Sequence, residues 1–123
     1  MTQATTATPT ITKARRLRNL LRDERPVVSP GIYDGYSLLL VEAMGFKTAA
    51  TSGSALSNSL IVQPDISIMS LRENVDACRH FARAVSIPLM ADADTGYGNA
   101  VTVHHVVQYF EEAASSASIS RIS

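Results

Sequence analysis

The chain has 123 residues, 46% of them hydrophobic, and its 11 basic side chains balance its 11 acidic ones. This composition fits one globular domain rather than a disordered tail, and the zero net charge argues against nucleic-acid binding through excess positive charge. No apolar run approaches the roughly 20 residues that cross a membrane, and the single cysteine, Cys78, allows no internal disulfide, so we expect a cytoplasmic protein without membrane contact.

The first segment, residues 1–12, is rich in threonine and alanine and lacks an apolar stretch. We expect it to be a flexible leader rather than a targeting peptide. The next segment, residues 13–24, places Leu17, Leu20 and Leu21 on one side among arginines, a spacing that predicts an amphipathic helix.

A strand followed by a helix is then predicted three times up to residue 113. The predicted strands are residues 27–29, 46–51 and 87–91. The predicted helices follow Asp34, Ser70 and Asn99, which are residue types that cap helix N-termini. Residues 52–69 have the composition of a polar connection. About three strand–helix units after a leading helix indicate an α/β fold with a parallel sheet covered by helices.

Small polar clusters follow the predicted strands. They are Tyr33-Asp34, Ser52-Gly53-Ser54 and Asp92-Ala93-Asp94. Ligands bind at the carboxyl ends of strands in α/β folds, so these clusters mark the expected functional site.

The most specific motif is the string DADTGYGN at residues 92–99. Asp92 and Asp94 leave a strand two residues apart and therefore point the same way, and paired carboxylates without His or Cys suit Mg²⁺. A calcium loop of the EF-hand type is excluded, because Tyr97 and Val103 stand where it needs Gly and Glu. A phosphatase-type D-x-D-x-T motif and a solvated acidic turn that caps the next helix remain open.

The other clusters are less specific. The segment Ser52-Gly53-Ser54 could hold an anion with its amides and hydroxyls, or it could be a simple turn. Tyr33 could be a core residue beside a helix cap, and Asp65 lies either in a turn or in a mobile lid.

Four segments together resemble a known family. They are PGIYD at residues 30–34, TSGS at 51–54, PD at 64–65 and DADTGYGN at 92–99. In this order and spacing they resemble the isocitrate lyase / phosphoenolpyruvate mutase superfamily, within it the 2-methylisocitrate lyase and carboxyvinyl-carboxyphosphonate phosphorylmutase group. The resemblance spans residues 14–113 and implies the N-terminal portion of a TIM-type (β/α)₈ barrel, usually a homotetramer.

The resemblance also implies roles for individual residues. It implies that Asp92 and Asp94 hold Mg²⁺ directly or through water, that Asp94 serves in catalysis, and that Asp92 also contacts substrate. Ser52 and Gly53 resemble the residues that bind the substrate carboxylate, with Ser54 in the same cluster.

Two further positions complete the implied site. Tyr33 resembles a substrate contact, and Asp65 resembles a catalytic aspartate of the gating loop, although Val62 stands where many relatives have glycine. The implied activity is a Mg²⁺-dependent lyase that cleaves or forms a carbon–carbon bond beside a 2-oxo acid, with a small carboxylate as substrate. Phosphonomutase and oxaloacetate decarboxylase activities of the same superfamily are alternatives.

The family's K-K-C-G-H loop, with its acid/base cysteine, does not occur in the 123 residues. We therefore expect a truncated, inactive form, and a non-catalytic α/β fragment is the competing interpretation. Residues 114–123 form an aberrant tail. With suitable synonymous codons, one inserted G after the codon of Ala113 turns the tail into AGVVGINLEDQ, which matches the family's fourth strand, so we expect a frameshift in the gene.

Overall fold

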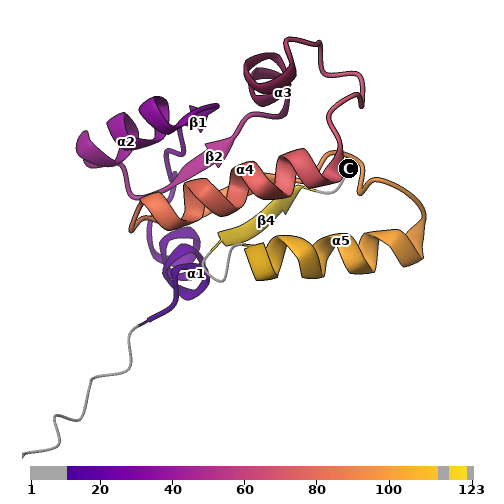
Figure 1. Ribbon diagram of the computed structural model, residues 1–123. Helices are drawn as coiled ribbons and strands as arrows, with labels where there is room; N and C mark the ends of the chain where they lie inside the picture. Colours follow the sequence, from indigo (N-terminus) through magenta and orange to yellow (C-terminus); the bar gives the residue numbers. More distant parts are fainter. Residues whose placement is uncertain (1–10, 114–116, 122–123) are drawn as a thin grey trace, which may run out of the picture.

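The computed structural model describes residues 11–113 and 117–121. Residues 1–10 of the expected leader, and residues 114–116 and 122–123 of the expected tail, lie outside this description. The helices and strands alternate along most of the chain (Figure 1). They are α1 (Lys13–Asp23), β1 (Gly31–Ile32), α2 (Gly35–Ala43), β2 (Ala49–Thr51), α3 (Gly53–Ile61), α4 (Leu71–Ala84), β3 (Leu89–Asp92), α5 (Ala100–Ala113) and β4 (Ala117–Arg121).

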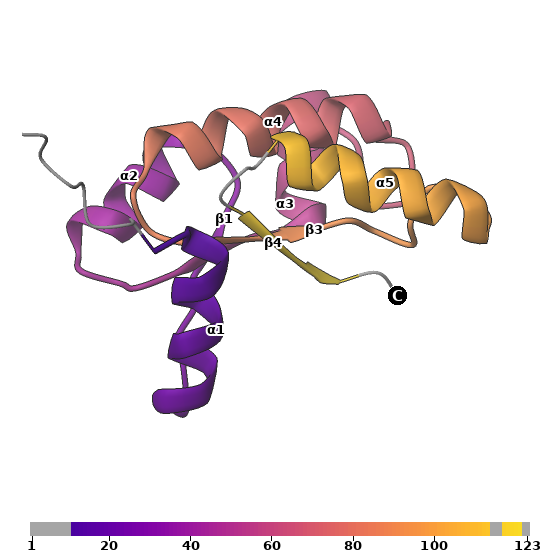
Figure 2. The same ribbon diagram turned by 90° about the horizontal axis from the view of Figure 1, so that it is seen from below.

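The four strands form one parallel sheet in the order β1-β2-β3-β4. Each strand pairs with the next one in the chain, so every right-handed crossover carries its helix to the same side. Figure 2 shows α2, α4 and α5 on one face of the sheet, with α1 projecting from the other. A doubly wound fold would reverse the strand order and place helices on both faces, whereas this arrangement is that of consecutive units of a (β/α)₈ barrel.

The core lies between the sheet and these helices. One cluster joins β1, α2, β2 and the start of β3, and its most buried members are Ile32, Leu38 and Ala49. A second cluster joins α4, β3 and α5 around Cys78, Val106 and Phe110. The clusters hold α2, α4 and α5 against the sheet.

Helix caps confirm three predicted helix starts. Asp34 accepts a hydrogen bond from the amide of Ser37 at 2.7 Å, and Ser70 forms a capping box with Glu73. Asn99 accepts from the amides of Val101 and Thr102 at 3.1 Å. These local bonds satisfy amides that the first helical turn leaves unpaired.

Two predicted segments were wrong. The first strand is Gly31–Ile32, not residues 27–29. The amides of Ala50 and Ser52 donate to the carbonyls of Pro30 and Ile32, whereas Val28 stays 62% exposed. The segment predicted as a polar connection contains the helix α3. Its buried residues are Leu56 and Ser57, and its many serines gave it the composition of a loop.

The tail continues the sheet. Ala117–Arg121 forms β4 and pairs in parallel with β3, from Leu89 opposite Ala117 to Asp92 opposite Arg121, with a register irregularity between Ala91 and Asp92. The described part of the tail thus occupies the place of a fourth barrel strand. The frameshift in the gene stays a prediction.

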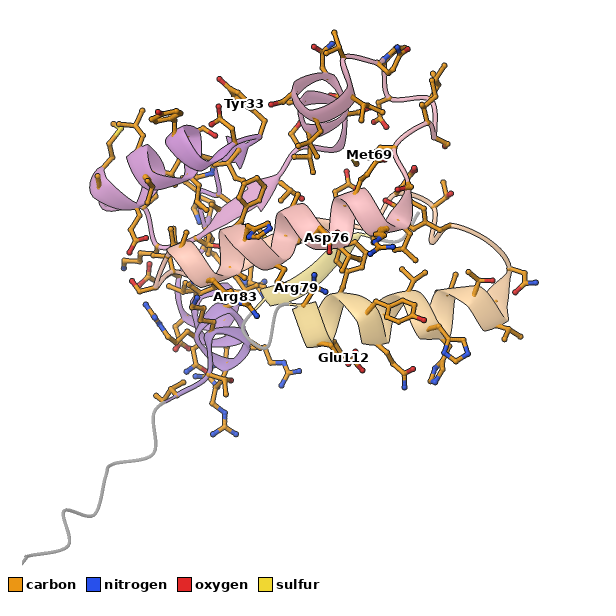
Figure 3. All side chains as sticks on the ribbon, in the orientation of Figure 1. Tyr33, Met69, Asp76, Arg79, Arg83 and Glu112 are labelled. Carbon is orange, nitrogen blue, oxygen red and sulfur yellow. The ribbon has the colours of Figure 1, made fainter. Side chains whose placement is uncertain are left out.

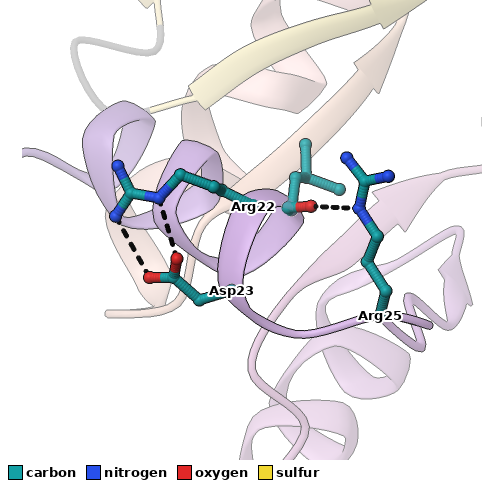
Figure 4. A network of polar contacts seen from close by, with 4 residues as sticks. Arg22, Asp23 and Arg25 are labelled. Atoms are coloured by element: carbon teal, nitrogen blue, oxygen red, sulfur yellow. Dashed lines mark hydrogen bonds and ion pairs between the residues drawn. The ribbon is translucent and has the colours of Figure 1, made fainter.

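The leading helix α1 is attached to the rest of the fold by Lys13, near its start. The Lys13 ammonium donates to the carbonyl oxygens of Ala82 and Val85, at 2.7 and 2.5 Å, and its partial burial lowers its pKa. At the other end, Arg22 pairs with Asp23 and Arg25 donates to the Leu21 carbonyl (Figure 4). The Arg22–Asp23 pair is exposed and adds little stability, so Lys13 is the stronger anchor.

Candidate functional site

A cavity of about 80 Å³ lies at the carboxyl edge of the sheet. It is lined by Gly53, Asp65, Ser67, Met69, Asn74, Asp92, Asp94 and Tyr97. These residues come from the start of α3, the segment that follows α3, the first turns of α4 and the loop after β3. The fold therefore gathers side chains that are distant in sequence at the edge where barrel proteins carry their ligands.

A larger hollow of about 600 Å³ lies at the opposite end, between α1 and the amino ends of β2 and β3. It is lined by both basic and acidic side chains, among them Lys47 and Glu24, which lie 2.6 Å apart. It lies away from the carboxyl ends of the strands, where α/β proteins bind ligands, so the smaller cavity is the better candidate site.

Asp92 is the last residue of β3 and is fixed by its backbone. Its amide donates to Thr51 Oγ1 at 2.9 Å, which ties β3 to β2 at the edge of the site. Its Oδ1 accepts from the Asp94 amide at 2.9 Å, and its Oδ2 faces Gly53. A methyl group at Gly53 would lie 2.9 Å from Asp92 Oδ2 and 3.5 Å from Asp65 Oδ2, so Gly53 keeps space between these carboxylates.

Asp94 is turned into the cavity by left-handed backbone. Its φ is 53°, and Gly96 and Tyr97 follow with φ of 89° and 60°. Ser67, which also has a positive φ of 63°, places its Oγ 3.5 Å from Asp94 Oδ2. The loop thus folds back on itself and presents Asp92 and Asp94 to the same space.

The buried side-chain amide of Asn74 bonds to the loop that follows β3. Asn74 is 1% exposed, and its Nδ2 donates to the Asp92 carbonyl at 2.9 Å and to the Tyr97 hydroxyl at 2.7 Å. Cys78, one turn further along α4, donates to Asn74 Oδ1 at 3.6 Å. Burial, and then the charge of Asp92, raises the pKa of the Cys78 thiol to about 12, so this thiol stays protonated.

The predicted site residues fall into two groups. Gly53, Asp65, Asp92 and Asp94 line the cavity. Ser52, Ser54 and Tyr33 do not line it: Ser52 caps α3 by accepting from the Ala55 amide at 3.4 Å, and Ser54 is exposed on α3. Tyr33 is 46% exposed; in Figure 3 it and Met69 lie to either side of α3.

Sequence reasoning missed four lining residues. They are Ser67, Met69, Asn74 and Tyr97. A signal existed for Asn74, a polar residue next to Val75 on the inward stripe of α4, and Tyr97 belongs to the DADTGYGN string. Ser67 and Met69 lie in an irregular segment where no periodicity could place them.

The donor set fits a hard cation. Within the described residues, no group of three or more His, Cys, Asp or Glu side chains is arranged to hold a metal ion. The adjacent carboxylates Asp92 and Asp94 nevertheless suit Mg²⁺, which is commonly bound by one or two carboxylates while it keeps several waters. The cavity that these carboxylates line, about 80 Å³, can hold such waters.

Comparison with known proteins gives the same relationship in sequence and structure. The sequence model of the family described as phosphoenolpyruvate phosphomutase matches residues 17–119. Oxaloacetate decarboxylase of Bradyrhizobium sp. (strain BTAi1 / ATCC BAA-1182) is 39% identical over 106 residues, covering 85% of this chain and 37% of that protein. 2-Methylisocitrate lyase of Aeropyrum pernix is 38% identical over 101 residues, covering 82% and 32%.

Among solved structures, a phosphonopyruvate hydrolase complex with oxalate and Mg²⁺ superposes with a TM-score of 0.80 at 39% identity, covering 85% of this chain and 36% of that one. The chain thus spans about a third of the length of the relatives that it matches. The expected fold, the N-terminal portion of a TIM-type barrel, is confirmed. In the part of the chain that the structure describes, the helices are too short or too polar to cross a membrane.

Proposed function

Because the chain belongs to the phosphoenolpyruvate phosphomutase family, in the isocitrate lyase / phosphoenolpyruvate mutase superfamily, we propose that its site binds the carboxylate of a 2-oxo acid together with Mg²⁺. The whole protein would be a lyase that cleaves a carbon–carbon bond beside that group. The observation that carries the proposal is the position of Asp92 and Asp94 in one cavity, with Gly53 and Asp65 facing Asp92.

The proposal gives a task to each predicted site residue that lines the cavity. Asp92 and Asp94 would hold the cation. The chemistry that Mg²⁺ supplies when bound is Lewis-acid polarisation of the 2-oxo acid, which stabilises an enolate. Gly53 lets the start of α3 approach Asp92 closely, and as the first residue of α3 its amide would donate to a carboxylate oxygen of the ligand.

Asp65 would close the site. It lies in the exposed segment after α3, yet its Oδ2 reaches to within 3.5 Å of the position that a methyl group on Gly53 would take. A carboxylate there would enter the cavity beside a bound ligand and leave it when the segment moves. This is the behaviour that the gating-loop role of Asp65 requires.

We further propose that the 123 residues bind ligand without turning it over. Proton transfer to an enolate needs a donor with a suitable pKa. The only cysteine of the chain is Cys78, and burial raises its pKa to about 12 and keeps its thiol in the core. It therefore cannot replace the acid/base cysteine that the family resemblance implies.

Oxaloacetate decarboxylation is the second candidate activity, favoured by the 39% identity to the Bradyrhizobium enzyme. Both candidate activities pass through an enolate beside a carboxylate and use the same metal site. The non-catalytic fragment remains the alternative for this chain. For the whole protein we propose a cytoplasmic location and the homotetramer usual in the family.

The proposal is tested by calorimetric titration of the 123-residue chain with oxalate, a stable analogue of such an enolate, with and without Mg²⁺. We expect binding only with Mg²⁺, and at least about tenfold weaker binding in Asp92→Asn and Asp94→Asn, because hydrogen bonds and charge contacts of this kind are worth about 1.5–3 kcal/mol. Glu112→Gln, which removes an exposed carboxylate from α5, is the matched control. Equal binding by all variants would contradict the proposal.

A further inference from the structure

The Asn74 side chain has only one possible orientation. One end of its amide lies 2.9 Å from the carbonyl oxygen of Asp92, which can only accept a hydrogen bond. That end is therefore the amino group. The carbonyl end faces the Cys78 thiol, which donates to it at 3.6 Å.

This orientation determines what the Tyr97 hydroxyl can do. The amino group of Asn74 also lies 2.7 Å from the hydroxyl oxygen, so the hydroxyl accepts a hydrogen bond there. A phenol that accepts from one side keeps its own O–H for another partner. Because Asn74 occupies the accepting side, the Tyr97 proton is directed away from α4, and Tyr97 lines the cavity that contains Asp92 and Asp94.

We infer that Tyr97 donates a hydrogen bond to an oxygen of the ligand bound in this cavity, and that Asn74 is the positioning residue that orients the Tyr97 hydroxyl. The inference rests on the proposed function, because it takes the ligand to be a carboxylate of the 2-oxo acid type. The Tyr97 hydroxyl would be a neutral hydrogen-bond donor in a cavity whose carboxylates hold the metal ion. It would bind a ligand oxygen that the cation does not contact.

The protonation state of Tyr97 agrees with this role. Burial raises the pKa of the phenol, and the hydrogen bond from Asn74 lowers it to a smaller extent. The phenol therefore remains protonated at neutral pH and can donate.

Three features hold the Tyr97 hydroxyl in place. Tyr97 lies in the turn between β3 and α5, where its backbone adopts a left-handed φ of 60°. Its ring packs against the core cluster of α4, β3 and α5. Asn74 is 1% exposed, so water does not compete for its amide. Ring, turn and amide thus hold the hydroxyl in one place before a ligand arrives, which lowers the entropy cost of binding.

The test is calorimetric titration of the 123-residue chain with oxalate at saturating Mg²⁺. Tyr97→Phe removes only the hydroxyl, and we expect about tenfold weaker binding. Tyr36→Phe makes the same change on a side chain that is 88% exposed on α2 and should leave the affinity unchanged. Asn74→Leu should weaken binding more in the unsubstituted chain than in the Tyr97→Phe background, because one part of its effect acts through the hydroxyl and the other through the Asp92 carbonyl.

Three outcomes distinguish a failure of the proposed function from a failure of the roles inferred for Tyr97 and Asn74. Oxalate binding that is as tight in Tyr97→Phe as in the unsubstituted chain would overturn the inference and leave the proposed function standing. An equal loss from Asn74→Leu in both backgrounds would show that Asn74 only supports the fold, and would overturn its positioning role. No Mg²⁺-dependent oxalate binding by the unsubstituted chain would overturn the proposed function and this inference with it. Tyr97→Phe alone decides the donor role if Asn74→Leu fails to fold.

Discussion

A methyl group at Gly53 would lie 2.9 Å from Oδ2 of Asp92, closer than real Cβ contacts allow. The first residue of α3 and the last residue of β3 therefore meet with no room for a larger side chain. This close approach joins two neighbouring strand ends into one site, and it explains why glycine stands at position 53.

Gly53→Ala tests this relationship. We expect the new methyl group to displace the Asp92 carboxylate and to weaken Mg²⁺-dependent oxalate binding about tenfold, the scale of one lost charged contact. Calorimetric titration measures the loss. Gly35→Ala is the matched control, because Gly35 is also the first residue of a helix and a methyl group there would meet nothing within 4 Å. Equal affinity in both variants would show that Asp92 is not constrained by Gly53.

The parts of the fold that depend on local chemistry were predictable. Asp34, Ser70 and Asn99 cap their helices through bonds to amides two or three residues away, and such bonds can be read from the sequence. The helix α3 was not predictable in the same way. It is rich in serine, and one of its two buried residues, Leu56 and Ser57, is itself polar, so the sequence shows no clear apolar face.

The candidate site shows the same division. Asp92 and Asp94 could be placed from their own motif. The contact between Asn74 and Asp92, and the one between Ser67 and Asp94, join residues that are 18 and 27 positions apart. Only tertiary packing of α4 and of the segment after α3 against the loop that follows β3 creates them, so no periodicity in the sequence could have shown them.

Val62 provides a stability prediction. It ends α3 in the left-handed region with a φ of 55° and is 76% exposed. A β-branched residue pays about 1–2 kcal/mol in that region, so Val62→Gly should raise the free energy of unfolding by about 1 kcal/mol despite the greater flexibility of glycine. Urea unfolding followed by circular dichroism measures the change.

The control for Val62→Gly is the same substitution at Val101. This side chain is 70% exposed but lies within α5, where glycine should lower the free energy of unfolding by about 1 kcal/mol. Opposite signs at the two positions would confirm that the backbone of Val62 is strained. A decrease in the free energy of unfolding at both positions would show that the packing of the Val62 side chain stabilises the fold by more than its left-handed backbone destabilises it.

Cys78 predicts how stability depends on alkaline pH. Burial, and then the charge of Asp92, raises the pKa of its thiol from 9.0 to about 12. Between these values the unfolded chain releases a proton that the folded chain keeps. The stabilisation is therefore complete below pH 9 and is lost as the pH rises toward 12, by up to about 1.4 kcal/mol for each pH unit.

Urea unfolding at several pH values between 9 and 11 measures this dependence. Cys78→Ala lacks the thiol, so its free energy of unfolding should fall less steeply over the same range, although Tyr97, whose pKa is also raised, still contributes. Iodoacetamide should modify Cys78 slowly in the folded protein and rapidly in urea, because the thiolate is the reactive form. Parallel pH curves for the two proteins would contradict the assignment.

The last prediction concerns the apolar face of α2. Its exposed members are Tyr36, Leu39, Leu40 and Met44, which are 88%, 52%, 60% and 67% exposed. Their spacing places them on one side of the helix, beside β1 at the edge of the sheet, where backbone groups lack a further strand among the described residues.

We expect copies of the 123-residue chain to associate through this face. Burying one leucine is worth about 1.5–3 kcal/mol, so the double variant Leu39→Lys, Leu40→Lys should weaken association by tenfold or more on sedimentation velocity. Leu60→Lys, which makes a single such substitution at an exposed leucine of α3, should leave association unchanged. If both variants sediment like the unsubstituted chain, the α2 face is not the contact surface.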